Sequence, residues 1–599
     1  MQTNRPFFGS KVGSKYVLRV ARPILNSLMF ILLGFLITAV INKIGYNIQS
    51  NKIIIFAQNQ YRVLFTLIGI IYLLRVLMCI GFKSYTVDLV TFLSLALIIF
   101  ITITLNLDRN IVWLNNFYYY ALIVFLLFLF ELSRYDIKSL SLVLNPAQLL
   151  MFSFAFIILL GSALLMLPKA TIQPISYVDA LFTSTSAVCV TGLNVLDTPQ
   201  TFTLLGKSVI LLLIQVGGIG IMTFTFFFGY FFKGTTSSFS EKFVLSDFLS
   251  DENVSDIAKT LLKVVVMTMS IELIGSIILF FSFDPTYFPT IDKRIHLSVF
   301  HSISAFCNAG FSTIEGGFYH ISTRNSAFLL YTISGLIVLG GIGFPILLNV
   351  YTFLKIKINR ISLFFGRKSN AVIVPQIINL NTRIVVLTTI FLILVGAVLF
   401  YLFEQNNSLA DYSIPLKIAH SVFGSVTPRT AGFNAIDYGG ITSVTIALTI
   451  FLMWVGASPV STGGGIKTTT FAIAIMNTFR IARMKNHIEM HQREIHERSV
   501  DRSFAIVILS IIILGCSSVV MVFLEPHLGV RQILFECVSA FGTVGLSMGI
   551  TPILSDASKL LLVGLMYGGR MGILTLLFAV FRRKSTSVYR YPKENVVII

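Results

Sequence analysis

Long apolar runs separated by short polar stretches make up most of the chain. Four runs of membrane-spanning length come before Pro146, near residues 24–41, 63–82, 89–107 and 117–130. After Pro146 the apolar runs come in pairs, and each pair encloses a shorter, partly polar segment that ends at a glycine. Since about 20 mainly apolar residues let a helix cross a bilayer, this pattern predicts an all-α integral membrane protein with about 12 spans.

The charge pattern orients these spans. Only 12% of the residues are charged, against roughly 25% in soluble domains, and the net charge is +19. The basic residues concentrate between apolar runs, in segments 5–22, 355–383, 480–502 and 582–593. Because cytoplasmic loops carry the excess of Lys and Arg, we expect both termini in the cytoplasm and the chain in the cytoplasmic (inner) membrane. Basic residues spread between spans do not form a nucleic-acid surface, so no nucleic-acid partner is expected.

A repeated motif follows the fourth span. Its copies share a small polar residue, a few further residues, a glycine and a bulky apolar residue: Ser186–Leu193, Ser304–Phe311, Ser425–Phe433 and Ser539–Leu546. The glycines recur at intervals of 113 to 122 residues. The third copy has one residue more than the others between its serine and its glycine, so we expect only pseudo-fourfold symmetry.

Each copy lies between two long apolar segments, so the predicted unit is helix, re-entrant pore loop, helix. We expect four non-identical units of this kind around one central pore, preceded by four extra transmembrane helices. The predicted divisions are an N-terminal four-helix membrane extension (1–140), pore repeat 1 (141–240), pore repeat 2 (241–360), pore repeat 3 with an intramembrane gating loop (361–500), and pore repeat 4 with a cytoplasmic tail (501–599).

The glycine loops have the chemistry of a cation filter. Irregular backbone at membrane depth is tolerated only where it is buried in protein or lines a water-filled cavity. A ring of backbone carbonyls can replace the hydration shell of a monovalent cation, and glycine permits the conformations that this needs. The predicted filter residues are Val190, Thr191, Gly192, Leu193, Asn308, Ala309, Gly310, Phe311, Thr430, Ala431, Gly432, Phe433, Thr543, Val544, Gly545 and Leu546.

Carboxylates follow three of the four glycines. Asp197, Glu315 and Asp437 each lie five residues after the glycine of their repeat, whereas the fourth repeat has Ile550 there. They either attract cations to the outer mouth of the pore or are ordinary solvated loop charges.

The second apolar segment of the third repeat is interrupted by glycines, a proline and hydroxyl residues, so it is not an ordinary lipid-facing helix. We expect a flexible gate loop beneath the filter that includes Ser461, Gly463, Gly464, Gly465 and Lys467. Arg570 lies in the corresponding segment of the fourth repeat. It is expected to face the pore and raise the barrier for cations, or to pair with a neighbouring carbonyl or carboxylate.

Stretches of small residues recur in the second apolar segments, at Gly217–Gly220, Gly340–Gly343, Gly456–Pro459 and Gly568–Gly572. The first two serve either close helix packing or gating. Glu272 is an ionisable residue within a predicted span, where such residues are either coupling sites or structurally paired groups.

Together these residues resemble the Trk/Ktr/HKT superfamily of potassium transporters, most closely the bacterial Trk and Ktr membrane subunits, over about residues 140–599. The most specific shared stretches are the glycine loops, Ser461–Thr470 and Gly569–Gly572. The resemblance implies a potassium filter around the four glycines, because members with serine at the first filter glycine tend to favour sodium. It also implies an intramembrane gating loop at 457–470, with Arg570 below the filter.

The resemblance further implies a homodimer on which a cytoplasmic, nucleotide-binding RCK-type subunit docks, with the basic loops as docking surfaces. We expect no covalently bound cofactor and no metal other than potassium held by filter carbonyls. The four N-terminal helices lie outside the core that the family shares.

Two alternatives to channel-like potassium uptake stay open. A sodium- or proton-coupled symporter would carry the same motifs, with Glu272 as a conceivable coupling group. A membrane-embedded metalloenzyme is favoured only by His487, His491 and His496, since the first two lie one helical turn apart. A solvated charged extension is the simpler explanation of these histidines, and no enzymatic activity is expected.

Overall fold

The computed structural model describes residues 32, 34, 45, 67–71, 146–220, 257–364, 379–490 and 493–580. The four predicted N-terminal spans lie outside the described residues except at a few positions, as does the tail after residue 580. Within the described part the chain is helical apart from one two-stranded hairpin, so the predicted all-α class is confirmed there.

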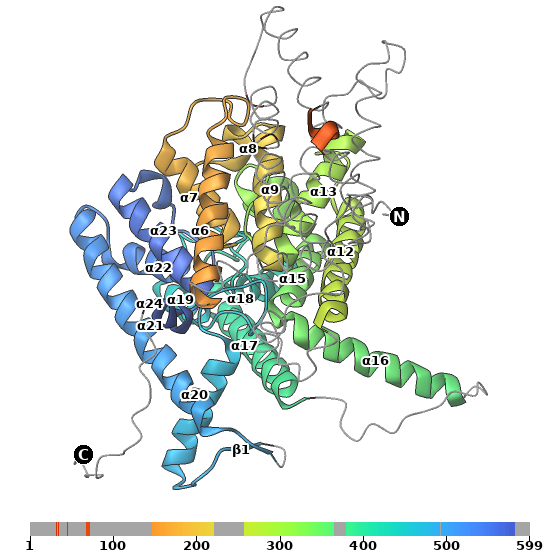
Figure 1. Ribbon diagram of the computed structural model, residues 1–599, viewed down its shortest axis with the longest axis vertical. Helices are drawn as coiled ribbons and strands as arrows, with labels where there is room; N and C mark the ends of the chain where they lie inside the picture. The colour runs from red at the N-terminus through yellow and green to blue at the C-terminus, as the bar shows by residue number, and fades with distance from the viewer. Residues whose placement is uncertain are drawn as a thin grey trace, which may run out of the picture.

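The same order of elements recurs four times along the described chain (Figure 1). A long apolar helix is followed by a shorter helix, a loop with the motif glycine, and a second apolar helix. These helices are α6 (Pro146–Leu165), α7 (Tyr177–Val188) and α9 (Leu204–Ile219); α12 (Ile257–Ser282), α13 (Ile291–Phe306) and α15 (Ala327–Ile342); α17 (Leu380–Glu404), α18 (Ile414–Val426) and α19 (Ser443–Trp454); and α21 (Glu497–Leu524), α22 (Val530–Gly542) and α23 (Asp556–Met571).

Shorter elements complete the described chain. Between the glycine loops and the second helices lie α8 (Thr198–Thr201), η2 (Gly317–Tyr319), α14 (Ile321–Arg324) and η3 (Thr551–Ile553). After the second helices come α16 (Phe344–Phe364), α20 (Thr468–Ala482), β1 (Glu489–Met490), β2 (Arg493–Glu494) and α24 (Ile573–Val580).

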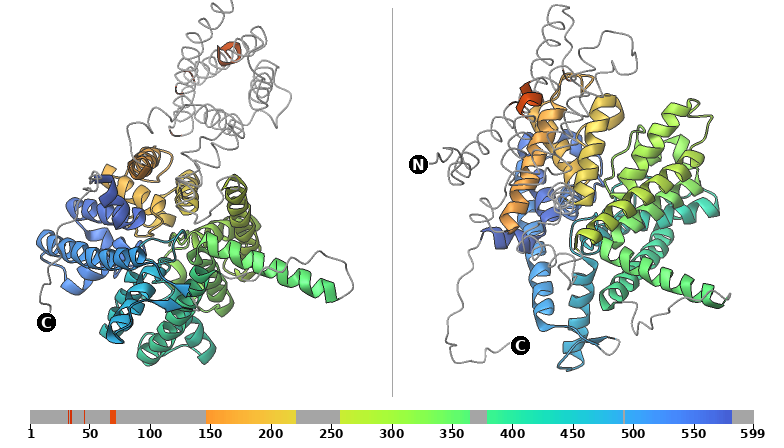
Figure 2. Two further views of the ribbon diagram at one scale, coloured as in Figure 1. Left: turned by 60° about the horizontal axis from the view of Figure 1, so that its bottom comes forward. Right: turned by 45° about the vertical axis from the view of Figure 1, so that its right-hand side comes forward.

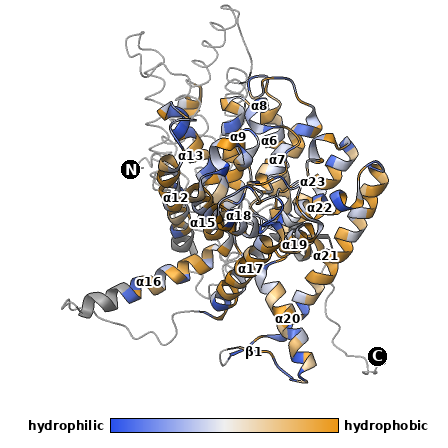
Figure 3. Ribbon diagram, turned by 180° about the vertical axis from the view of Figure 1, so that it is seen from behind, coloured by the Kyte–Doolittle hydropathy of each residue, from blue (hydrophilic) through white to orange (hydrophobic). Residues whose placement is uncertain are grey.

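Three helices in the described part are long and apolar enough to cross a membrane by themselves: Leu262–Ser282, Leu380–Glu404 and Glu497–Leu524. Only 22 to 33% of the residues in their most apolar stretches are buried within the protein. Their ribbons are mostly hydrophobic in Figure 3, and many of their large apolar side chains are exposed. Such large exposed apolar surfaces are typical of membrane contact, which agrees with the predicted membrane class.

The short helices pack against the first long helix of their own repeat. In the first three repeats a serine near the end of the short helix donates its hydroxyl proton to a backbone carbonyl of that long helix. The pairs are Ser184 with Ile158 at 2.7 Å, Ser302 with Glu272 at 2.7 Å, and Ser425 with Ile393 at 2.9 Å. A glycine of the long helix faces each serine: Gly161, Gly275 and Gly396 respectively. These contacts fix the register between the two helices in each repeat.

A second hydroxyl, two residues further on, holds each glycine loop. Ser186 and Ser539 accept from the amides of Gly192 and Gly545 at 3.0 and 3.1 Å, while Ser304 and Thr427 donate to the carbonyls of Phe311 and Phe433 at 2.8 and 2.6 Å. Main-chain hydrogen bonds show that these four hydroxyl residues are equivalent. In all four repeats the residue before the glycine donates its N–H to the carbonyl of the hydroxyl residue.

The predicted alignment of Ser425 with Ser186, Ser304 and Ser539 is therefore wrong. Thr427, and not Ser425, is the counterpart of Ser186, and it lies one residue closer to its glycine than Ser186 does. Ser425 is the counterpart of Ser184, which binds the first helix. The sequence misleads because serine and threonine are interchangeable as hydroxyl donors, and spacing alone does not distinguish them.

The second helices of three repeats end at a glycine with positive φ: Gly220 (82°), Gly343 (97°) and Gly572 (81°). Left-handed backbone of this kind favours glycine. After Gly343 the chain turns by 102° into α16, which extends away from the other helices (Figure 2). The glycine three residues earlier, at 217, 340 and 569, lies against a carbonyl near the end of its own short helix, where a Cβ would not fit. Close packing, one of the two roles predicted for the first two of these glycines, is what these contacts show.

The third repeat continues beyond its second helix into α20 and an antiparallel hairpin, β1 and β2, at the bottom of Figure 1. Here the predicted histidine cluster does not form a metal site in the part that the structure describes. His487 Nδ1 lies 2.6 Å from Glu494 Oε1, His496 caps α21 by accepting from the amide of Arg498, and His491 lies outside the described residues. No group of three His, Cys, Asp or Glu residues among the described positions is arranged to hold a metal.

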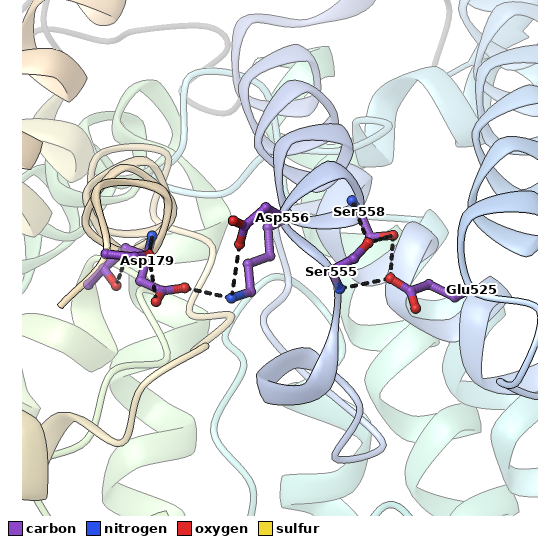
Figure 4. A network of polar contacts seen from close by, with 8 residues as sticks. Asp179, Glu525, Ser555, Asp556 and Ser558 are labelled. Carbon is purple, nitrogen blue, oxygen red and sulfur yellow. Dashed lines mark hydrogen bonds and ion pairs between the residues drawn. The ribbon is translucent and has the colours of Figure 1, made fainter.

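Polar contacts near one end of the membrane-spanning helices connect the last repeat to the first (Figure 4). Lys559 on α23 lies 2.7 Å from Asp179 on α7, and both side chains are largely buried. On the other side of α23, Glu525 accepts from the amide of Ser555 at 2.8 Å and from the hydroxyl of Ser558 at 2.7 Å. Desolvation opposes ionisation of Glu525, but these hydrogen bonds prevail and hold its pKa below the usual value. The start of α23 is thus bound to both α7 and α21.

Replacing Lys559 by Met is expected to destabilise the protein by about 2 kcal/mol, because the largely buried side chain of Asp179 loses its ion-pair partner. The midpoint of thermal unfolding in detergent measures this effect. His527→Gln is the matched control, since His527 is exposed and lies 3.8 Å from Glu525. Equal midpoints for the two variants would contradict the assigned role of Lys559.

Thr427→Val keeps the shape of the side chain but leaves the Phe433 carbonyl without its donor. We expect a loss of about 1–2 kcal/mol in the same unfolding measurement. Thr352→Val is the control, because the Thr352 hydroxyl bonds a carbonyl of its own helix on an exposed face. If the two substitutions have the same effect, Thr427 is not the residue that holds the third loop.

Candidate functional site

The four motif glycines meet in a closed ring. A Cβ built on Gly192 would lie 2.5 Å from the carbonyl oxygen of Ala309, and one on Gly310 would lie 2.8 Å from that of Ala431. In the same way Gly432 faces the carbonyl of Val544, and Gly545 faces that of Thr191, which returns to the first repeat. Each glycine therefore touches the next repeat in chain order, and the fourth touches the first. No side chain would fit at any of the four positions.

The backbone of the four loops follows one conformation. Each glycine has a positive φ, between 70° and 92°. The residue two positions earlier also has a positive φ although it is not glycine: Val190 (56°), Asn308 (61°), Thr430 (73°) and Thr543 (50°). A non-glycine residue in the left-handed region is uncommon and is maintained only where the surrounding structure holds it. Finding it at the same place in all four loops shows that the conformation belongs to the repeat.

Carbonyl oxygens of neighbouring repeats lie against the four glycines. The oxygen of the residue before each glycine, at Thr191, Ala309, Ala431 and Val544, lies close to the glycine of a neighbouring repeat. The ring thus alternates carbonyl oxygens with glycines that have no side chains. All sixteen residues of the predicted filter lie in these four loops, and the twelve that carry side chains are at most 1% exposed.

The loops also touch through the side chains that precede the ring. The amide of Asn308 lies 3.2 Å from the hydroxyl of Thr430, in either orientation of the amide, and so links the second and third repeats. Thr543, at the same place in the fourth repeat, points to the gate loop instead. Among the four residues at this place, only Thr430 and Thr543 carry hydroxyl groups. Only the third and fourth repeats therefore present a hydroxyl group to the gate loop.

The gate loop runs between α19 and α20, directly against these side chains. The amide of Gly464 donates to the Thr543 hydroxyl at 2.9 Å, and Gly463 lies against Thr430 with no room for a Cβ. Gly465 has a positive φ of 65°. The Lys467 ammonium bonds the carbonyl of Gly463 at 2.7 Å, so this charge is held by the loop itself.

Two further contacts attach the gate loop to the second repeat. The amide of Ser458 donates to the carbonyl of Gly341 at 3.0 Å, and the amide of Phe344 donates to the carbonyl of Val460 at 3.1 Å. Ser461 stays within the loop, where its hydroxyl donates to the Ser458 carbonyl at 2.7 Å. The loop is therefore bound where the second helix of that repeat breaks.

Arg570 connects the gate loop to the first repeat. Its guanidinium donates to the carbonyl of Thr462 in the loop and to the carbonyl of Gly217 at the end of α9. Pairing with carbonyls, one of the two roles predicted for this arginine, is thus observed, and a role as a barrier in the pore stays a prediction. Sequence analysis did not name Thr462 and Gly217 as its partners, although both lie in segments that it singled out.

The three predicted outer carboxylates do not form one group. Burial raises the pKa of Asp197, the nearby Glu315 carboxylate raises it further, and Lys207 opposes both effects. Glu315 accepts a hydrogen bond from Gln200 in the first repeat. Asp437 is exposed and accepts from the amide of Gly439 within its own turn, at 2.9 Å. The structure brings Asp197 and Glu315 near each other, and it gives Asp437 a local role.

Comparisons with known proteins agree with this arrangement. The TrkH family model, described as a cation transport protein, matches residues 138–589. The potassium/sodium uptake protein NtpJ of Enterococcus hirae is 33% identical over 465 residues, 76% of this chain and 97% of NtpJ. The Ktr system potassium uptake protein B of Bacillus subtilis is 35% identical over 456 residues, 76% of this chain and 96% of that protein.

The fold has a counterpart among solved structures. The crystal structure of the potassium transporter TrkH from Vibrio parahaemolyticus superposes with a TM-score of 0.58 at 15% identity, covering 87% of this chain and 97% of that one. At this identity the likeness concerns the fold. Together with the family match and the sequence relatives, it shows that this chain belongs to the TrkH family of membrane cation transport proteins, a family of transporters and not of enzymes.

Proposed function

We propose that this chain takes up potassium across the cytoplasmic membrane through the ring of glycines and carbonyls. The closed ring carries the proposal, because backbone oxygens from all four repeats lie next to its glycines. Carbonyl oxygens of this kind replace the water that a potassium ion loses, and no covalent cofactor takes part. The named relatives in Enterococcus and Bacillus are uptake proteins for potassium, or for potassium and sodium.

Potassium, and not sodium, is the proposed main ion. Glycine occupies all four ring positions, and the resemblance ties that pattern to potassium. A side chain at any position would push on a neighbouring carbonyl and distort the ring. Asp197 and Glu315 lie together on the surface after their loops and would raise the local cation concentration, with Asp437 contributing from a separate turn.

The gate loop is the proposed obstruction below the ring. It contacts Thr430 and Thr543, the residues that begin two of the filter loops, and it is held by Arg570. A loop rich in glycine can move when these few contacts break, whereas the packed helices around it cannot. We assign gating to Ser461, Gly463, Gly464, Gly465 and Lys467, together with Arg570.

The proposed assembly is a homodimer in the lipid bilayer with both termini in the cytoplasm. Residues 1–140 form the additional membrane unit, and the four repeats occupy 141–240, 241–360, 361–500 and 501–599. A cytoplasmic, nucleotide-binding RCK-type subunit is the proposed regulator. Half-buried Arg480 and exposed Arg483 and Lys485, beside the hairpin, offer it a basic surface.

Coupled symport through the same ring is the second candidate. The buried Glu272 carboxylate in α12 favours it, because an ionisable group inside a span is a usual site of proton or sodium coupling. A reversal potential that shifts with pH or sodium gradient would identify symport. A reversal potential set by potassium alone would support channel-like uptake.

Potassium flux through the purified protein in liposomes tests the main proposal. An outward potassium gradient is compared with an equal sodium gradient, with empty liposomes as the blank. Potassium-selective flux is the expected result. If the protein moves neither ion, even with a cytoplasmic extract of its host present, the proposed function is wrong.

Gly432→Ser should weaken the discrimination of potassium from sodium, because its Cβ meets the Val544 carbonyl and the strained backbone opens the ring. We expect roughly a 10-fold loss in the flux ratio, equivalent to about 1.4 kcal/mol. Gly564→Ser is the matched control, since nothing lies within 4 Å of a Cβ there. Unchanged selectivity in a folded Gly432→Ser protein would mean that this loop is not part of the filter.

Arg570→Ala should raise flux several-fold, because the gate loop loses its bond to α9. Arg570→Lys keeps the charge and one donor, and its flux should stay closer to that of the unmodified protein. Radioactive rubidium uptake into liposomes measures both variants. A fall in flux with normal folding would mean that Arg570 holds the loop in its open position.

A further inference from the structure

Behind the ring, one position differs in charge among the four repeats. The residue three before the motif glycine is Cys189, Cys307, Arg429 or Gly542. In the second repeat, Cys307 Sγ points to the interface with the first repeat, 3.8 Å from Gln215 Oε1 on α9. In the third repeat, Arg429 lines a small cavity at the interface with the second repeat. Its other lining residues are Ile337, Val338, Gly341, Thr389, Val426 and Ala457.

Arg429 is a buried arginine that forms no ion pair with any residue that the structure describes. Its side chain is 7% exposed, and its Nη2 lies 3.5 Å from the Thr389 hydroxyl. Its Nε has no hydrogen-bond partner. None of the ion pairs among the described residues includes it. Removing an arginine from water is costly unless the charge is compensated, so its positive potential acts on its surroundings with little screening.

Glu272 is a buried acidic residue at the interface between the first and second repeats. It is 4% exposed, and both of its carboxylate oxygens accept from Gln215 Nε2, at 3.0 and 3.1 Å. Its Oε1 is also 3.8 Å from Cys307 Sγ. No cationic side chain in the described part of the chain forms an ion pair with it. The side chain of Cys307 is thus the link between this carboxylate and the second glycine loop.

The two charges occupy equivalent interfaces. Gly275 of α12 and Gly396 of α17 contact equivalent serines in the second and third repeats. These two glycines therefore align the sequence of α12 with that of α17. In that register Thr268 corresponds to Thr389, and Glu272 corresponds to Ile393. The interface between repeats 1 and 2 thus contains an acid, and the interface between repeats 2 and 3 contains a base.

We propose that Arg429 and the ionised form of Glu272 act as two fixed charges of opposite sign behind the filter, and that together they set its affinity for potassium. Glu272 attracts the ion toward the inner part of the ring, and Arg429 repels it. Their effects on ion binding are therefore opposite in sign. This role rests on the proposed filter and adds two residues that do not line it.

The test is the potassium concentration that gives half-maximal flux in liposomes at alkaline pH, where Glu272 is ionised. A unit charge about 10 Å from an ion, at an effective dielectric constant of about 20, changes ion binding by roughly 10-fold. Glu272→Gln should therefore raise the half-maximal concentration by about 3- to 10-fold, and Arg429→Gln should lower it by a similar factor. The double variant should return close to the unmodified value.

Glu272→Asp and Arg429→Lys are the matched controls, because they change the packing but keep the charges. Both should stay within about twofold of the unmodified protein. The proposal is overturned if both charge-removing variants shift the concentration in the same direction, or if the controls shift it as much. If Arg429→Gln does not fold, the test rests on Glu272→Gln. The proposal is then rejected if the half-maximal potassium concentration of Glu272→Gln is equal to or lower than that of the unmodified protein.

The same experiment separates this inference from the proposed function. If the unmodified protein carries no potassium-selective flux, the proposed function fails and this inference fails with it. If selective flux is present and the two variants do not shift it in opposite directions, only the fixed-charge role is rejected.

Discussion

The requirement that every backbone polar group at membrane depth finds a partner governs this structure. A loop that leaves the helical conformation inside a bilayer exposes amides and carbonyls that lipid cannot bind. Here four such loops solve the problem in the same way. A hydroxyl in each short helix and the carbonyl of the same residue hold the loop from behind, and the front of the loop faces the next repeat. Each loop is therefore stable only when its neighbours are in place.

Mutual support of this kind explains why the repeats resemble one another most at their glycines. The glycine has to touch a carbonyl of the adjacent repeat, and its positive φ is shared by all four. Away from the ring the repeats have diverged. The third supplies the gate loop, the fourth supplies Arg570, and the break that ends α9 in the first supplies a carbonyl to that arginine. Fusing four units in one chain permits this division, because each unit can change by itself.

The same divergence places charge unevenly around the ring. Glu272 and Arg429 lie in corresponding interfaces, yet one is an acid and the other a base. A ring of identical subunits could not have this arrangement, since every interface would carry the same residue. An ion in the proposed filter would therefore experience an asymmetric field. In the proposed function the carbonyl ring would coordinate the ion, and the charges behind it would adjust how strongly the ion is held.

The sequence by itself determined the features that depend on the composition of single segments. Hydrophobic runs predict the helices, and the recurring glycines at 192, 310, 432 and 545 predict the four loops. The interrupted helix at 457–470 and Arg570 also stand out, because they break the pattern around them. Each of these signals depends on local composition and spacing, which the chain carries before it folds.

Only the tertiary structure decided which segments meet. It showed that the glycines close into a ring, that Arg570 binds Thr462 and Gly217, and that Thr427 replaces the expected Ser425. These contacts join residues that are often more than a hundred positions apart, and they depend on how whole helices pack. Hydroxyl groups and carbonyls have no pattern in the sequence that specifies a partner, so geometry alone assigns one.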